Sequence, residues 1–407
     1  IASDSTVQTY DEYYYPQTGW GQVFYNFFKG NENVLEYESK NCNYSQAQTY
    51  ETSSVIIENR AIGGRSSKSF IEEGKLDDLL EDVKPGDYVL VQWAHNDATA
   101  SRPNRYVPVS DFEKYIQYYI DGVTQRGGTC VLVTPVARRS YTETNGVASF
   151  KSDFEAYRQV MLKIEKEQNI GLLDLTSASI ELCNKFGAEG SKALFLWLNA
   201  GDYQGAYAGG VSDSTHLQYY GAYKFAQCVA NLINEYEKDS KLDTLKSLLD
   251  LEPAFETVPK TPTGLEEVTV GATSVSMKWD AVEDAELYYI YRLKLEAGQS
   301  PDDASFDGAE KYSVSAFEKF TDTNCIGGNT YVYSVAGFNE LGVGDKSEKL
   351  VVTMKSALYK YDFCLDASNP TLEGWTQVTC KQLYNKDAGY GFLKAPGNGR
   401  NRANNGN

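Results

Sequence analysis

The first 250 residues alternate short apolar runs with longer segments of helical period. The apolar runs are typical of buried strands and cover residues 55–57, 88–94, 130–133 and 172–175. Helices are predicted at 110–125, at 217–236, and along one apolar stripe made of Phe150, Phe154, Tyr157, Met161 and Ile164. This alternation is typical of a parallel sheet with helices on both faces. We therefore predict a doubly wound α/β/α domain over residues 1–250, with its ligand crevice beyond the carboxyl ends of the strands.

The spacing of apolar residues changes after a proline-rich stretch, which we interpret as a linker at 251–258. From residue 259 to residue 355, apolar side chains recur at every second position between turns that contain glycine. Examples in one strand are Val275, Met277 and Trp279. Because a period of two indicates strands with one buried face, this stretch predicts an antiparallel β-sandwich.

The sandwich stretch resembles a fibronectin type III domain. The residues that carry the resemblance are P-x-G-L at 262–265, SVSMKW ending at Trp279, YYIYR at 288–292 and NTYVYSVAGFNELGVG at 329–344. The resemblance implies two antiparallel sheets packed face to face.

Neither end of the chain has the pattern of a complete domain. Residues 356–407 are too few for a large core, and we predict a partial β-rich segment there. It either opens a further sandwich or extends the neighbouring one, and further modules of the same chain would follow it. At the other end, Ile1 lies inside a motif, so we expect that upstream residues, including any export signal, have been removed. Of the seven cysteines, only Cys364 and Cys380 are plausible disulfide partners.

Composition argues against several classes of protein. Acidic residues outnumber basic ones by 56 to 38, and the formal net charge of −18 repels nucleic acid and anionic lipid. No apolar run approaches the roughly 18–20 residues of a membrane helix. The cysteines form no C-x-x-C pair and the chain has only 2 histidines, which disfavours zinc ribbons and histidine-rich metal sites. We therefore expect a soluble protein with no nucleic-acid partner and no membrane insertion.

Four short polar blocks each lie beside a predicted strand end. They are SDSTV at 3–7, NRAIGGRS at 59–66, AHND at 94–97 and DSTH at 213–216. Taken singly, each has an ordinary explanation as a helix cap, a loop or an Asx turn. Taken together, they place a hydroxyl, a glycine, an amide and a carboxylate–histidine pair at successive strand ends. They also contain both histidines of the chain, so we interpret them as one site.

The four blocks are similar to those of the SGNH, or GDSL-type, hydrolases, an esterase superfamily named for its Ser, Gly, Asn and His. The matching residues are Ser5, Gly64, Asn96, Asp213 and His216. A finer resemblance to the rhamnogalacturonan acetylesterase branch rests on YPQTGWGQVF at 15–24, AIGGRSSKSF at 61–70 and HND at 95–97. The resemblance covers about residues 1–245 and implies a flavodoxin-like α/β/α fold. Ser3 and Ala94 depart from the pattern, because glycine is usual at both positions.

The residue types in these blocks suit acyl transfer without a metal or other cofactor. A serine hydroxyl needs an adjacent base, so the predicted catalytic residues are Ser5 as nucleophile, His216 as base and Asp213 as the group that orients His216. The predicted oxyanion hole consists of the backbone N–H groups of Ser5 and Gly64 and the side-chain amide of Asn96.

Three further features are candidate substrate contacts, each with an alternative interpretation. His95 either touches sugar hydroxyls or supports Asn96 from below. Arg65 either contacts an acidic sugar or forms a local salt bridge. The tyrosines at positions 13–15 either form a platform for a sugar or pack against their neighbours.

The leading interpretation is a secreted carbohydrate esterase that removes O-acetyl groups from plant cell-wall polysaccharide, with acetylated pectin (rhamnogalacturonan) ahead of acetylated xylan. Its partner is then the polysaccharide, and its location is extracellular. A second interpretation is a short-chain SGNH esterase of other specificity. A third is a non-catalytic carbohydrate-binding or adhesion protein. Because every candidate residue precedes position 217, we also expect the first 258 residues to act as an esterase alone.

Overall fold

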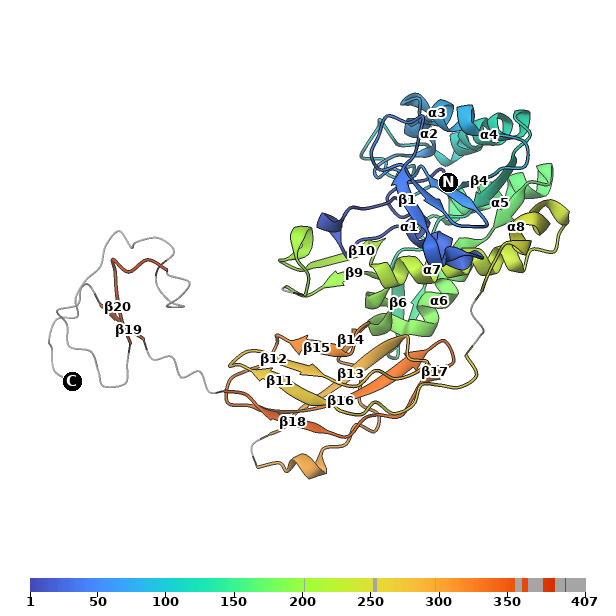
Figure 1. Cartoon of the computed structure of the whole chain (residues 1–407). Helices are drawn as coiled ribbons and strands as arrows, with labels where there is room; N and C mark the ends of the chain where they lie inside the picture. Colours follow the sequence, from blue (N-terminus) through green and yellow to red (C-terminus); the bar gives the residue numbers. More distant parts are fainter. Residues whose placement is uncertain are drawn as a thin grey trace, which may run out of the picture.

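The computed structural model describes residues 1–200, 202–251, 255–296, 298–355, 361–364, 376–384 and 392. It contains an α/β part followed by a β-rich part, and the two lie against each other (Figure 1). Among the described residues, the helices are too short or too polar to cross a membrane.

The centre of the α/β part is a parallel sheet. Its labelled strands are β3 (Ile56–Asn59), β4 (Tyr88–Val91), β5 (Thr129–Val133) and β8 (Gly171–Leu173). Residues 1–3 lie between β3 and β4: the N–H of Ala2 donates to the carbonyl of Leu90 at 2.9 Å, and the N–H of Ile62 donates to the carbonyl of Ser3 at 3.0 Å. The strands therefore lie in the order β3, residues 1–3, β4, β5 and β8. Numbered by their order along the chain, this is the order 2-1-3-4-5, which confirms the flavodoxin-like sheet.

Helices cover both faces of this sheet. Those on one face are α2 (Ser67–Glu72), α3 (Lys75–Asp82), α4 (Val109–Gln125) and α5 (Glu155–Gln168). Those on the other are α1 (Trp20–Val23), α6 (Leu175–Gly190), α7 (Tyr219–Asn234) and α8 (Asp243–Ser247). Strand β5 shows why both layers form: Cys130 and Leu132 pack with the first set, whereas Val131 and Val133 pack with the second.

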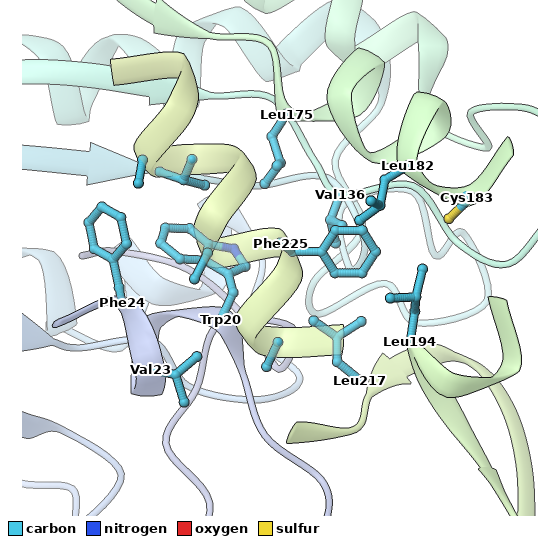
Figure 2. Close-up of a cluster of buried hydrophobic side chains, with 14 of the residues drawn as sticks. Trp20, Val23, Phe24, Val136, Leu175, Leu182, Cys183, Leu194, Leu217 and Phe225 are labelled. Atoms are coloured by element: carbon cyan, nitrogen blue, oxygen red, sulfur yellow. The ribbon is translucent and has the colours of Figure 1, made fainter. Parts of the chain in front are cut away.

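The second helical layer shares a large aromatic and aliphatic core (Figure 2). The ring of Trp20 lies 5.5 Å from that of Phe24, and both belong to the cluster that contains Phe225 of α7. This packing fixes the start of α7, where the polar segment 213–216 precedes the helix.

The remaining elements of the α/β part are short. Strands β1 (Leu35–Glu38) and β2 (Gln48–Glu51) extend β3 in antiparallel fashion, and two hairpins are formed by β6 (Tyr141–Thr144) with β7 (Val147–Phe150) and by β9 (Phe195–Leu198) with β10 (Val211–Leu217). Single 3₁₀ turns are η1 (Glu12–Tyr14), η2 (Phe24–Phe27), η3 (Asn31–Asn33), η4 (Ser191–Ala193), η5 (Gly205–Tyr207) and η6 (Ser240–Leu242).

The predicted helical stripe was wrong at its N-terminal end. Phe150 ends strand β7, and Phe154 is the N-cap residue that precedes α5, which begins at Glu155. Asn145 and Gly146 have φ angles of 52° and 77°, which gives the tight turn that an Asn-Gly pair favours between two strands. The hairpin therefore takes the first residue of the stripe out of the helix.

The β part consists of two antiparallel sheets. One contains β11 (Glu266–Val270), β12 (Val275–Lys278) and β15 (Lys319–Asp322). The other contains β14 (Ser313–Ser315), β13 (Leu287–Lys294), β16 (Thr330–Asn339), β17 (Gly342–Val343) and β18 (Leu350–Thr353), and the 3₁₀ turn η7 (Pro301–Asp303) follows β13. Val275 of β12, Ile290 of β13 and Tyr333 of β16 share one core between the sheets. The predicted β-sandwich is therefore present.

Strand β13 is buried on both of its faces. Tyr288 and Ile290 point into the sandwich core, whereas Leu287, Tyr289 and Tyr291 belong to the apolar cluster of the α/β part. The apolar cluster of the α/β part therefore continues into the outer face of the sandwich, and we call it the shared core. The period-two pattern did not indicate it.

Specific contacts fix this shared interface. The hydroxyl of Tyr289 donates to the carbonyl of Phe186 on α6 at 3.0 Å, and the rings of Phe186 and Phe338 lie 4.8 Å apart. Lys224 of α7 forms an ion pair with Glu286 at 2.6 Å, and the Lys224 side chain is only 3% exposed. A buried ammonium that loses its carboxylate carries a large desolvation cost.

Part of the C-terminal segment falls within the described residues. Strands β19 (Tyr361–Cys364) and β20 (Thr376–Thr379) pair in parallel. The side chain of Cys364 lies outside the described residues, so the Cys364–Cys380 pair stays a prediction, as does the rest of 356–407.

The shared core changes the expectation for a chain cut after Val258. Such a chain loses the contacts that Tyr289 and Phe338 make with Phe186 on α6, and it leaves Lys224 without the carboxylate of Glu286. We expect it to unfold at a Tm lower by at least about 5 °C than the full chain, measured by calorimetry. A chain ending at Lys355 keeps the interface and is the control. Equal Tm values for the 1–258 and 1–355 chains would contradict a stabilising interface.

Candidate active site

Three of the predicted residues form a hydrogen-bonded relay at the carboxyl end of the sheet. The Oγ of Ser5 lies 3.0 Å from Nε2 of His216, and Nδ1 of His216 lies 2.8 Å from Oδ2 of Asp213. Ser5 follows the strand formed by residues 1–3, whereas Asp213 and His216 lie on β10. A serine, a histidine and a carboxylate in this order are the groups that serine hydrolases use to activate a hydroxyl.

The His216 side chain and two local backbone N–H groups hold Asp213 in its ionised form. Its Oδ1 accepts hydrogen bonds from the N–H groups of Thr215 at 2.7 Å and His216 at 3.0 Å. Burial by itself raises the pKa of Asp213, but the His216 side chain and these N–H groups outweigh it and lower the pKa to about 2. The register of β10 against β9 shifts between Ser212 and Leu217, which frees the segment to form this compact turn.

A buried polar network supports the turn that presents Ser5. Oδ1 of Asp4 accepts from the N–H of Thr6 at 3.0 Å and from its hydroxyl at 2.9 Å. The side-chain amide of Gln92 donates to the Thr6 hydroxyl at 2.9 Å and accepts from the indole of Trp20 at 3.0 Å. These contacts tie the turn to β4 and to α1.

The two departures from the family pattern have different structural consequences. The Ser3 hydroxyl is buried and donates to the carbonyl of Gln92 at 2.8 Å, so this serine finds a partner. Ala94 has a φ of 143°, a region that glycine occupies far more easily than alanine. The loop before His95 therefore carries backbone strain.

The predicted oxyanion donors are the N–H groups of Ser5 and Gly64 and the side-chain amide of Asn96. An ideal Cβ at Gly63 would lie 3.4 Å from the Cβ of Ser5, so the glycine loop passes close to Ser5, and Gly64 has a φ of 77°. The amide of Asn96 donates one hydrogen bond to the carbonyl of Arg65 at 2.7 Å and has a second N–H. Within the described residues, the N–H groups of Ser5 and Gly64 donate no hydrogen bond to another group of the protein. They are therefore available to a developing oxyanion.

His95 faces the protein interior. Its Nε2 lies 3.0 Å from the carbonyl of Val136, and its ring lies 4.4 Å from that of Phe154. Burial lowers the pKa of His95 to about 4, with Arg138 adding to the effect and Asp4 opposing it. A neutral, buried imidazole in this position favours the supporting role over contact with sugar hydroxyls.

Arg65 forms a local salt bridge, which was one of its two predicted roles. Its Nε pairs with Glu73 at 3.0 Å and its Nη1 donates to the carbonyl of Gly63 at 3.0 Å. The guanidinium thus braces the glycine loop, and its role as a sugar contact is not supported by these contacts.

The tyrosines at positions 13–15 lie at the surface, with exposed fractions of 61%, 41% and 46%. The Tyr15 ring lies 5.7 Å from that of Tyr203, and both line a cleft of about 700 Å³ between the β9–β10 hairpin and strands β14 and β15. Exposed aromatic rings beside a cleft keep the sugar-platform interpretation open.

Sequence reasoning missed several side chains that organise the site. Tyr10 donates to the carbonyl of Ser5 at 2.7 Å, and Oε1 of Gln8 accepts from the N–H of Gly63. Asp97 is buried, and its Oδ1 accepts from the N–H of Ser67 at 3.0 Å, which holds the start of α2 behind the glycine loop. Of Gln8, Tyr10 and Asp97, only Asp97 belongs to one of the four polar blocks, AHND at 94–97. Gln8 and Tyr10 lie in no motif from which their roles could be predicted. Among the described residues, groups of three or more metal-ligating side chains are not found.

Comparison with known proteins places this geometry in a family. Residues 4–229, more than half of the chain, match the family described as GDSL-like Lipase/Acylhydrolase, and the chain belongs to this family. The chain is 35% identical over 236 residues to the "Probable rhamnogalacturonan acetylesterase YesY" of Bacillus subtilis, covering 58% of this chain and 91% of that protein. It is 31% identical over 235 residues to the rhamnogalacturonan acetylesterase RhgT of the same organism, covering 58% and 88%. The chain is thus an SGNH hydrolase similar to rhamnogalacturonan acetylesterases.

Replacing Ser5 with alanine tests the nucleophile. The kcat for p-nitrophenyl acetate should fall by at least roughly 10³-fold, because the relay then has no hydroxyl to activate. Ser3→Ala removes a hydroxyl two residues away and should keep kcat within about tenfold. A Ser5→Ala enzyme as active as Ser3→Ala would remove Ser5 from the nucleophile role.

Replacing Asn96 with alanine tests the oxyanion hole. The expected loss is about 10²–10³ in kcat with little change in KM, because the second N–H acts mainly on the transition state. Steady-state kinetics on p-nitrophenyl acetate separate the two constants, and a thermal melt shows whether the lost bond to the Arg65 carbonyl weakens the fold. An increase in KM with kcat unchanged would assign Asn96 to substrate binding instead.

Proposed function

We propose that this protein is a serine esterase that removes O-acetyl groups from rhamnogalacturonan. The observation that carries the proposal is the Ser5–His216–Asp213 relay beside the glycine loop, in a family whose similar members include rhamnogalacturonan acetylesterases. Because its substrate is a cell-wall polymer, we propose that the protein acts outside the cell.

The first half of the reaction acylates the serine. The Ser5 hydroxyl attacks the acetyl carbonyl while its proton moves to Nε2 of His216, and Asp213 stabilises the resulting imidazolium. The backbone N–H groups of Ser5 and Gly64 and the side-chain amide of Asn96 donate hydrogen bonds to the negatively charged oxygen that was the carbonyl oxygen. His216 then donates its proton to the departing sugar oxygen, which leaves the sugar alcohol and an acetyl–Ser5 ester.

The second half of the reaction restores the enzyme. His216 takes a proton from a water molecule, whose oxygen attacks the acetyl–Ser5 carbonyl. Collapse of this intermediate releases acetic acid and returns the proton to the Ser5 oxygen. These steps need the side chains already named.

Two alternatives differ in specificity or in catalysis. An acetylxylan esterase or another short-chain SGNH esterase would use the same relay with a different sugar surface. A carbohydrate-binding protein would keep the fold but not the chemistry. The hydrogen-bonded contact between Ser5 and His216 favours the enzyme over this second alternative.

The deciding experiment measures acetate release from acetylated rhamnogalacturonan and acetylated xylan at equal acetyl concentration. We expect faster release from rhamnogalacturonan and negligible hydrolysis of acyl chains of about eight or more carbons, because an acetyl pocket needs only a small cavity. Ser5→Ala is the blank for non-enzymatic release. A preference for xylan of more than about tenfold would move the protein to the acetylxylan alternative. Absence of hydrolysis on every ester would make it a binding protein.

A further inference from the structure

Arg105 is a guanidinium beside the glycine loop that lacks a carboxylate partner among the described residues. Its Nη1 donates to the carbonyl of Gly64 at 3.3 Å, a long hydrogen bond. Its Nε is buried from solvent and has no described hydrogen-bond partner. A guanidinium has five N–H donors, and in the described part of the protein those of Arg105 make this one long hydrogen bond.

Three other arginines of this part of the chain form ion pairs with carboxylates. Arg60 contacts Glu58 at 2.8 Å, Arg65 contacts Glu73 at 3.0 Å, and Arg158 contacts Asp174 at 2.6 Å. A chain with 56 acidic residues has ample carboxylates for its cations. Among the described residues, Arg139 has no carboxylate partner but donates to the Ser191 hydroxyl and the Ala188 carbonyl, and the guanidinium of Arg138 lies over the ring of Phe154. Arg105 differs from these arginines in its place, because its partly buried guanidinium lies against the glycine loop.

The glycine loop connects the position of Arg105 with that of Ser5, where the ester would react. Gly64 follows Gly63, whose ideal Cβ would lie 3.4 Å from the Cβ of Ser5, and an ideal Cβ on Gly64 would lie 3.3 Å from Nη1 of Arg105. The guanidinium therefore borders the loop that carries a predicted oxyanion donor. Burial lowers the pKa of Arg105, the neighbouring Arg102 lowers it further, and Asp4 opposes both. A partly desolvated cation in this place is suited to an anion that arrives with the substrate.

We propose that Arg105 binds the carboxylate of a uronic acid residue that carries the acetyl ester or adjoins it. This inference rests on the proposed function and deepens it, because it assigns recognition of an acidic sugar to one side chain. The guanidinium fork matches the two oxygens of a carboxylate, a geometry that a lysine ammonium does not reproduce. It also gives this protein of net charge −18 a local attraction for an anionic polymer.

The test uses two small substrates that differ only in the proposed contact. One is an O-acetylated methyl galacturonate, and the other is the matching acetylated methyl galactoside, in which a hydroxymethyl group replaces the carboxylate. For Arg105→Gln, we expect kcat/KM on the galacturonate to fall about tenfold to a hundredfold, mainly through KM. Hydrolysis of the galactoside and of p-nitrophenyl acetate should stay within about twofold.

Two further variants separate recognition from general electrostatics. Arg102→Gln removes the same charge from an exposed position of the same loop and should change all three rates by less than about threefold. Arg105→Lys keeps the charge without the fork and should restore only part of the activity on the galacturonate.

The outcomes distinguish the inference from the proposed function. An equal loss on all three esters in Arg105→Gln would make Arg105 a support for the glycine loop and overturn the inference. So would unchanged discrimination between the two sugars. A wild-type enzyme that cleaves p-nitrophenyl acetate but neither sugar ester would overturn the proposed function, and this inference with it.

Discussion

The site depends on the backbone hydrogen bonds that hold residues 1–3 between β3 and β4. Through these bonds, the first residues of the chain become the second position of a parallel sheet, and Ser5 emerges at its carboxyl end. The glycine loop and the block around Asn96 leave the two neighbouring strands at the same edge. Groups from three separate stretches of chain therefore meet because adjacent parallel strands end together.

The fourth block reaches the site by a different route. The hairpin of β9 and β10 lies outside the parallel sheet, and the packing of α7 on the aromatic core fixes its end. His216 then meets Ser5 across 211 positions of sequence, and Asp213 needs only the local turn to reach His216. The relay thus combines one long-range contact with one short-range contact, and the long-range contact relies on both halves of the core.

Prediction from the sequence succeeded where a chemical group follows a strong local pattern. Strands β4 and β5 lie where the apolar runs 88–94 and 130–133 predicted them, although β4 ends at Val91, and Ser5, Asn96 and His216 lie in short blocks beside strand ends. Prediction failed where a distant contact involves a residue that lies in no recognisable motif. The contact between Arg105 and Gly64 spans 41 positions, and no local pattern distinguishes Arg105 from the paired Arg65.

The shared core of the two parts had a sequence signal that was interpreted too narrowly. The run LYYIY at 287–291 is apolar at each position, which indicates burial on both faces rather than an alternating strand. Tyr289 uses its outer face to reach Phe186. The sandwich thereby braces α6 and α7, and α7 follows the strand that carries His216.

Covalent labelling tests the central claim, that Ser5 is the nucleophile activated by His216, most directly. The intact protein is treated with diethyl p-nitrophenyl phosphate, which transfers a phosphoryl group to an activated serine, and its peptides are mapped by mass spectrometry. The account predicts stoichiometric label on Ser5 with parallel loss of esterase activity, and little label when His216 is replaced by alanine. Inactivation with the label on another residue, or labelling of Ser5 that does not depend on His216, would contradict it.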